Sequence, residues 1–255
     1  MTRTNARAAM GLALAALLYP CFGAAAQSAQ PLPADVVKQD IRDIEEMYQR
    51  RVEQTPFPGL YRLDMGPVRG ARRTSPVLLT RGAEYGFNNG VRGPRREEDH
   101  VALSLADWEK LVMRWRDSIR LGDLVQFGEG PLRLIVLSSF DCPYSKALEA
   151  KLAGAGIRYA VAPSTIGTAN ARYLPDLWCS ADRAASWRAA INEGRMPPRA
   201  DRACRYDADY FETLSGLLGG SAPTLLYADG TIANVSTLAP VEAKLAELAR
   251  RDIQF

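Results

Sequence analysis

The chain has few of the residues that build metal sites. It contains one histidine, His100, and four cysteines in 255 residues. The histidine lies in a charged loop segment, and the cysteines are too widely separated for the ligand spacing of a metal site. The sequence therefore predicts no metal and no other cofactor.

An excess of charge of one sign is also lacking. The chain has 32 Lys and Arg residues against 29 Asp and Glu residues, which gives a formal net charge of +3. Its basic clusters, at residues 69–73 and 92–100, lie in segments rich in Gly and Pro and are best interpreted as solvated turns. A nearly neutral chain has no electrostatic reason to bind nucleic acid or anionic lipid.

Long hydrophobic runs are missing except near the N-terminus. Arg3 and Arg7 precede an apolar run at residues 8–18, and small residues follow up to Ala26. This order is typical of a secretory signal peptide, predicted here at residues 1–26. The run is short for a permanent anchor, and Tyr19-Pro20 is a poor setting for a lipid attached to Cys21. We expect export, and a periplasmic location.

Three cysteines remain after such a cleavage: Cys142, Cys179 and Cys204. In an oxidising compartment a pair of cysteines normally closes, and an odd one draws attention. Cys179 and Cys204 flank a helical segment and a Pro-rich turn, so a structural disulfide is the simplest interpretation of that pair. Cys142 is then the odd thiol.

The first part of the remaining chain, residues 27–121, has the pattern of a small α+β domain. Apolar residues at steps of three and four predict a helix over residues 34–52. Short strands are expected at residues 59–65, 75–81 and 83–87, with a tight turn at Asn89-Gly90. Residues 104–119 return to a helical pattern that begins with a cap at Ser104 and Asp107. No catalytic constellation stands out in this part.

A Gly-rich linker, residues 122–131, leads to a second part, residues 132–255, in which strands and helices alternate. Strands are predicted at residues 132–139, 157–163 and 221–235, the last as two strands around Asp229-Gly230. Helices are predicted at residues 142–156, 169–193 with a break at Pro175, 207–218 and 240–251. The order is β-α-β, a helical insertion, and then β-β-α.

The odd thiol lies in the segment SSFDCPYS, directly after a buried strand and before a helix. Cys142 can therefore take the N-cap position, with Pro143 at the first helical position. The positive end of the helix favours a thiolate, which is the attacking species. The Ser145 hydroxyl falls in the first turn and can donate a hydrogen bond to the sulfur. The alternative is an inert, buried thiol, and the role of Asp141 stays open.

Three segments together carry a resemblance to a known family. They are residues 132–164, which include the Cys142 motif, residues 174–204, and the segment GGSAPTLLYADGTI at residues 219–232. They resemble the thioredoxin-fold domain of the bacterial periplasmic disulfide isomerases of the DsbC/DsbG type. The resemblance runs from about residue 124 to the C-terminus, and the order of parts before it matches in layout only. It implies an α/β thioredoxin-like fold with a helical insertion, preceded by a small α+β, cystatin-like domain.

The resemblance also implies roles for particular residues. Cys142 matches the nucleophilic cysteine, and Tyr144 takes the place of an aromatic residue common before the second cysteine of the family. Ala222-Pro223 matches a cis-proline loop that holds the substrate strand. Cys179 and Cys204 match the structural disulfide of the helical insertion. The N-terminal domain would form a homodimer, and the partners would be unfolded or disulfide-containing proteins of the cell envelope.

The chain departs from the family at Ser145, where C-x-x-C has become C-P-Y-S. One thiol suffices for disulfide exchange and shuffling when a thiol of the substrate expels the enzyme, but not for complete oxidation or reduction within the site. We therefore expect a monothiol disulfide isomerase. The alternative is a non-redox chaperone or assembly factor of the envelope. A thiol peroxidase is disfavoured because Ile135 and Ser139 replace the proline and threonine usual in those sites.

Overall fold

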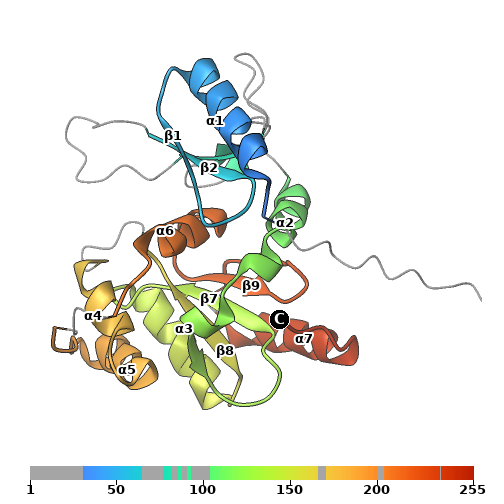
Figure 1. Ribbon diagram of the computed structural model, residues 1–255. Coiled ribbons are helices and arrows are strands. Elements are labelled where there is room, and N and C mark those ends of the chain that lie inside the picture. Colours follow the sequence, from blue (N-terminus) through green and yellow to red (C-terminus); the bar gives the residue numbers. More distant parts are fainter. Residues whose placement is uncertain are drawn as a thin grey trace, which may run out of the picture.

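The computed structural model describes residues 31–64, 77–81, 86–87, 91–92, 104–165, 171–199, 204–235 and 237–255. The predicted signal peptide, Cys21, the turn at Asn89-Gly90 and His100 lie outside these residues. Within them the chain forms two five-stranded sheets with helices around them (Figure 1).

The first sheet is an antiparallel meander in the strand order β1-β2-β3-β4-β5. Its strands are β1 (Val52–Gln54), β2 (Leu60–Leu63), β3 (Val77–Thr80), β4 (Gly86–Phe87) and β5 (Val91–Arg92). Helix α1 (Ala34–Tyr48) precedes them. This is the expected small α+β unit, with β1 and β5 in addition to the predicted strands.

Helix α1 is shorter than the sequence pattern predicted. It ends at Tyr48 because Gln49 adopts a left-handed conformation, with φ of 51°, as helix C-termini often do. The expected helix over residues 34–52 was therefore wrong at its end, where Val52 already belongs to β1.

The two faces of the first sheet bury their side chains in different cores. Tyr61 and Leu79 are paired across β2 and β3 and lie in one core with Ile44 of α1. Leu60 and Leu78 point to the opposite face, since successive strand residues alternate, and they join the large core of the rest of the molecule. The first sheet is thus packed between α1 and the second part of the chain.

Helix α2 (Leu105–Met113) connects the two parts. It begins where the sequence predicted. Ser104 is its N-cap, and the Ser104 side chain accepts the backbone N–H of Asp107. The predicted range 104–119 was too long, and only a short 3₁₀ turn, η2 (Arg116–Ser118), continues it. Trp108 donates its indole N–H to the Leu217 carbonyl and Trp115 donates its own to the Pro58 carbonyl, so both tryptophans hold parts of the fold together.

The second sheet has the strand order β10-β9-β7-β8-β6. Its strands are β6 (Val125–Phe127), β7 (Leu134–Ser138), β8 (Tyr159–Pro163), β9 (Thr224–Tyr227) and β10 (Ile232–Ala233). The central pair β7 and β8 is parallel and the other pairs are antiparallel. Helix α3 (Pro143–Gly154) joins β7 to β8, and α7 (Leu238–Arg250) follows β10. The four strands β10-β9-β7-β8, together with α3 and α7, form a thioredoxin-like fold, and β6 is added at one edge of the sheet.

The segment expected to be a linker, residues 122–131, is partly built into this sheet. After the 3₁₀ turn η3 (Leu121–Asp123), residues Val125–Phe127 pair with β8 as an added edge strand. The glycines in this segment obscured a three-residue strand, in which the inward Val125 and Phe127 are buried and Gln126 between them is exposed.

The helical insertion comprises η4 (Ala171–Tyr173), α4 (Leu174–Trp178), α5 (Arg183–Glu193) and α6 (Ala208–Leu217). The break predicted at Pro175 is found one residue earlier, where η4 ends at Tyr173 and α4 begins at Leu174, with proline in the first turn of α4, where its missing N–H is not needed. A second break, which was not predicted, falls between Trp178 and Arg183, where Asp182 caps α5 by accepting the Ala185 N–H.

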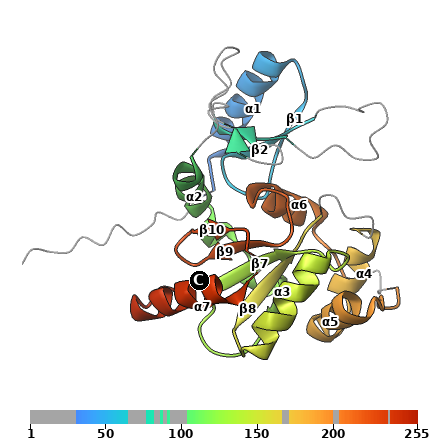
Figure 2. The same cartoon turned by 180° about the vertical axis from the view of Figure 1, so that it is seen from behind.

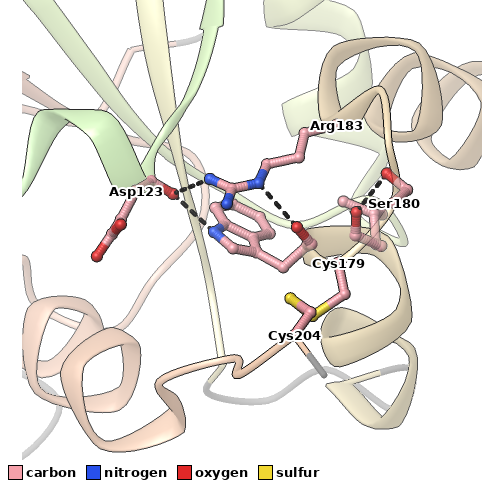
Figure 3. Close-up of a disulfide and its surroundings, with 7 residues drawn as sticks. Asp123, Cys179, Ser180, Arg183 and Cys204 are labelled. Carbon is pink, nitrogen blue, oxygen red and sulfur yellow. Dashed lines mark hydrogen bonds between the residues drawn. A yellow bond between two sulfur atoms is a disulfide. The ribbon is translucent and has the colours of Figure 1, made fainter. Parts of the chain in front are cut away.

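A disulfide between Cys179 and Cys204 closes this insertion, with the two Cα atoms 5.6 Å apart. Figure 3 shows its surroundings: Arg183 donates to the Trp178 carbonyl at 2.7 Å and also contacts the Asp123 carbonyl. The Trp178 indole N–H donates to that same Asp123 oxygen at 2.6 Å. The disulfide region is thereby tied to the turn before β6.

Helix α6 lies between the second sheet and the first sheet (Figure 2). The Tyr210 ring of α6 stacks on Phe57, with the ring centroids 5.4 Å apart, and Arg62 of β2 pairs with Asp209 at 3.0 Å. Among the helices described, none is long and apolar enough to cross a membrane.

Candidate active site around Cys142

Cys142 lies where the buried strand β7 gives way to α3. It is the N-cap residue, its N–H donates to the Ser139 carbonyl at 3.0 Å, and Pro143 begins the helix. The thiol is partly exposed and is the free cysteine of the described residues. All five residues of β7 are buried. Cys142 lies beyond the end of this strand, and its side chain can therefore reach the surface.

The loop before β9, the neighbour of β7 in the sheet, also approaches this thiol. Strands β7 and β9 are antiparallel, with Leu137 paired to Thr224, so the end of β7 meets the start of β9. The Cys142 thiol donates to the Ala222 carbonyl, with sulfur and oxygen 3.5 Å apart. The Ala222-Pro223 peptide bond is cis. The structure thus brings together Cys142, Ala222 and Pro223, as the family resemblance implied.

Ser145 is placed differently from the expectation. Its side chain is fully buried, and its hydroxyl oxygen accepts the Ser139 N–H at 3.3 Å. In the described part of the chain, no hydrogen bond joins this hydroxyl to the Cys142 sulfur. Ser139 also donates its own hydroxyl to the Asp141 carboxylate. These contacts hold the turn of residues 139–142, and they turn Asp141 toward Ser139.

Two open cavities adjoin the thiol, and they share no lining residue. The proline-side cavity has a volume of about 300 Å³ and is lined by Tyr144, Ser221, Ala222, Pro223, Asn234 and Val235. Tyr144 is 67% exposed, which is unusual for a large apolar side chain in the described residues. This cavity therefore offers an aromatic ring and backbone groups beside the sulfur.

The α5-side cavity has a volume of about 350 Å³ and includes Cys142 itself. The start of α3 and the end of α5 form it together. Its lining residues are Phe140, Asp141, Cys142, Pro143, Lys146, Ala190, Ile191, Asn192, Glu193 and Gly194. The Lys146 ammonium donates to the Asn192 carbonyl at 2.6 Å and so bridges the two helices. No pattern in the sequence indicates this cavity, because its two walls come from helices that only the tertiary structure brings together.

A buried carboxyl group, Glu149, lies seven residues after the thiol on α3. Trp187 donates to it at 2.9 Å, and the Ser138 and Tyr159 hydroxyls also donate to it. Burial raises the pKa of Glu149 to about 7, and the hydrogen bonds offset only part of this effect. Sequence reasoning missed this residue, although its spacing from Ser145 and Leu152 places it on the buried face of α3.

The site has the parts for nucleophilic attack on sulfur: one accessible thiol at a helix N-terminus, a carbonyl beside it, and open space on two sides. A second free thiol is not found among the described residues, because Cys179 and Cys204 are joined. Nor do the described His, Cys, Asp and Glu residues form a group of three that could hold a metal ion.

No protein-family model and no curated protein matches this chain. Among solved structures, a disulfide interchange protein from Neisseria gonorrhoeae is similar, with 23% identity, covering 54% of this chain and all of that one, at a TM-score of 0.43. A linker-deletion mutant of Proteus mirabilis ScsC is similar over 58% of this chain and 84% of that one, with 15% identity and a TM-score of 0.42. TM-scores below 0.5 are too low to indicate an activity for this chain.

Proposed function

We propose that this protein is an exported thiol–disulfide exchange protein, a monothiol relative of the disulfide isomerases, that attacks disulfides of other polypeptides through Cys142. The observation that carries the proposal is the partly exposed Cys142 thiol at the N-cap of α3, 3.5 Å from the Ala222 carbonyl. The positive end of a helix stabilises a thiolate, and the neighbouring loop offers backbone groups to a substrate strand.

In the proposed reaction the Cys142 thiolate attacks one sulfur of a substrate disulfide. The substrate S–S bond breaks, its other sulfur leaves as a thiolate, and a mixed disulfide forms on Cys142. A different thiolate of the same substrate then attacks this mixed disulfide and expels Cys142. The substrate has exchanged one disulfide for another, and the protein ends unchanged, so no external oxidant or reductant is consumed.

The substrate polypeptide would lie in the proline-side cavity. Tyr144, Pro223 and Val235 provide apolar contacts there, and Ala222 provides backbone groups next to the sulfur. The N-terminal pattern at residues 1–26 supports export to the periplasm. For the unit of α1 and the first sheet we propose homodimerisation, which sedimentation of the mature chain tests directly.

A non-redox chaperone is the second candidate, because the exposed Tyr144 ring beside an open cavity can bind unfolded chains without any thiol chemistry. One experiment separates the two functions. Recovery of a disulfide-rich substrate with scrambled disulfides is followed with the mature protein and with Cys142→Ser. Exchange predicts recovery that is lost in the variant. Equal suppression of aggregation by both forms, with no recovery by either, supports the chaperone and contradicts the exchange function.

A further inference from the structure

The α5-side cavity is the feature that the proposed reaction leaves unused. It touches the nucleophile directly, since Cys142 is part of its lining. The proline-side cavity is formed by other residues and meets the thiol through Ala222. A substrate polypeptide that binds in the proline-side cavity therefore leaves the α5-side cavity free, and a second molecule can reach the sulfur through it.

When the substrate has no free thiol of its own, a monothiol site needs a second thiol compound that can reach the Cys142 sulfur and release the substrate. The mixed disulfide on Cys142 is then stable, because position 145 carries a buried hydroxyl in place of a resolving thiol. Among the described residues Cys142 is the free cysteine. Release of the substrate thus requires a thiolate from outside the chain, attacking in line with the S–S bond that breaks.

The charges of the cavity indicate which kind of thiol it suits. An ammonium group has three N–H donors, and Lys146 uses one on the Asn192 carbonyl, which leaves two for a carboxylate. Glu193 is the last residue of α5, at the negative end of the helix dipole. Its carboxylate forms an exposed ion pair with Arg195 at 2.9 Å. Such exposed pairs are weak, so Glu193 can instead bind an ammonium group. The lining thus holds one cation, Lys146, and two carboxylates, Glu193 and Asp141, and Cys142 belongs to the same lining. Asp141 already accepts the Ser139 hydroxyl, so we assign the ligand's ammonium group to Glu193.

We propose that the α5-side cavity binds a low-molecular-weight thiol carrying both a carboxylate and an ammonium group, such as cysteine or a small cysteine-containing peptide, and that this thiol resolves the mixed disulfide on Cys142. The carboxylate would bind Lys146 and the ammonium Glu193. The volume of about 350 Å³ lies at the small end of ligand pockets, in accord with an amino-acid-sized ligand. This inference rests on the proposed function.

The step conserves atoms and electrons. The small thiolate attacks the Cys142 sulfur, the bond between Cys142 and the substrate sulfur breaks, and the substrate leaves as a thiolate that takes a proton from solvent. Cys142 is now disulfide-bonded to the small thiol. A second small thiolate attacks the small-thiol sulfur of this bond and frees Cys142, so two small thiols are oxidised to their disulfide while the substrate cysteines are reduced.

A single-turnover experiment tests this without a natural substrate. Cys142 is first converted to its mixed disulfide with dithiobis(nitrobenzoate), and release of the coloured aromatic thiolate by added thiols is followed by stopped flow. The probes are L-cysteine, cysteamine, 3-mercaptopropionate and 2-mercaptoethanol, which carry both charges, the positive charge, the negative charge or neither. Each rate is divided by the rate of the same thiol with a small soluble mixed disulfide of nitrothiobenzoate, which removes differences in intrinsic reactivity.

We expect the normalised rate to be about tenfold higher for L-cysteine than for 2-mercaptoethanol, equivalent to about 1.4 kcal/mol of added interaction, and to saturate with L-cysteine concentration. Lys146→Gln and Glu193→Gln should each remove most of this preference. Lys151→Gln is the matched control, because Lys151 is also exposed on α3 and does not line the cavity; it should keep the preference.

Equal normalised rates for all four thiols, rising linearly with concentration, would overturn the proposal. If Cys142-dependent recovery of scrambled substrate still occurs in that case, the proposed function stands and the thiol site alone fails. If native Cys142 forms no mixed disulfide with the reagent, both fail together.

Discussion

The sulfur of Cys142 lies 3.5 Å from the carbonyl oxygen of Ala222, although 80 residues separate them in the sequence. The antiparallel pairing of β7 and β9, which sets Leu137 opposite Thr224, produces this contact. The same pairing places the thiol next to the proline-side cavity, whereas the α5-side cavity comes from the packing of the start of α3 against the end of α5. The chemistry proposed for this chain therefore depends on this strand register and on that helix packing.

Ser145→Cys should convert the site into a dithiol that closes on itself. The N-cap side chain and the third helical residue lie next to each other at a helix start, and serine and cysteine are similar in size. After oxidation, the denatured variant should contain no free thiol, whereas the denatured mature wild-type chain should contain one. The variant should also oxidise a reduced substrate stoichiometrically. Ser145→Ala is the matched control and should keep one free thiol. Two titratable thiols in oxidised Ser145→Cys would contradict this prediction.

Glu149→Gln should flatten the pH dependence of stability. Folding raises the pKa of Glu149 from an ordinary value near 4.5 to about 7. Its contribution to stability is therefore complete below about pH 4.5 and is lost as the pH rises through 7. At 1.36 kcal/mol per pKa unit, the loss between the two limits is roughly 3 kcal/mol.

Urea unfolding of wild type and Glu149→Gln at pH 5 and pH 8 measures this effect as a difference in the free energy of unfolding. The difference between the two pH values should be smaller in the variant, whatever the absolute stabilities. Ser138, Tyr159 and Trp187 surround the carboxyl group, and the nearby Arg188 charge acts on it. An unchanged pH difference in the variant would show that Glu149 does not titrate between these values.

Replacing both Cys179 and Cys204 by serine should destabilise the fold without removing the nucleophile. The bridge spans 25 residues, and a loop of that length corresponds to roughly 3.5 kcal/mol of unfolded-state entropy in the chain-entropy model. The urea midpoint should fall accordingly, while Cys142 is still alkylated in the folded variant. Cys142→Ser is the control for cysteine loss as such. An equal effect of both variants on the midpoint would argue against a structural role of the bridge.

Phe57→Ala should destabilise the whole molecule by about 3–5 kcal/mol, the usual cost of removing a buried phenylalanine. Phe57 is fully buried and stacks on Tyr210 of α6, in a core that the first sheet shares with the second. Circular dichroism and tryptophan fluorescence should therefore report one coincident transition. Met47→Ala is the control, because Met47 is 59% exposed and such changes usually stay within about 0.5 kcal/mol. Two separate transitions in the wild type would contradict a shared core.

The local elements of the second part and the position of the thiol at a helix start could be predicted from the amino-acid sequence alone. The continuous apolar run at residues 134–137, inside the predicted strand 132–139, indicates a buried strand in an alternating pattern of strands and helices, and β7 is found there. Pro143 and the helical pattern behind it predict a helix start, and Cys142 is its N-cap. These features follow from side-chain periodicity and backbone restriction, which act over a few residues.

The surroundings of the thiol, by contrast, depend on contacts between residues far apart in the sequence. Strand β6 is three residues long and is stabilised by its pairing with β8, so local propensity could not reveal it. The burial of Glu149 and the use of the Ser145 hydroxyl by Ser139 depend on what packs over α3. The Ala222 contact and the wall of α5 arise from long-range register and helix packing. A periodic pattern shows which face of a helix or strand is buried. Which other helix or strand packs on that face depends on contacts between distant parts of the chain, and these a local pattern does not contain.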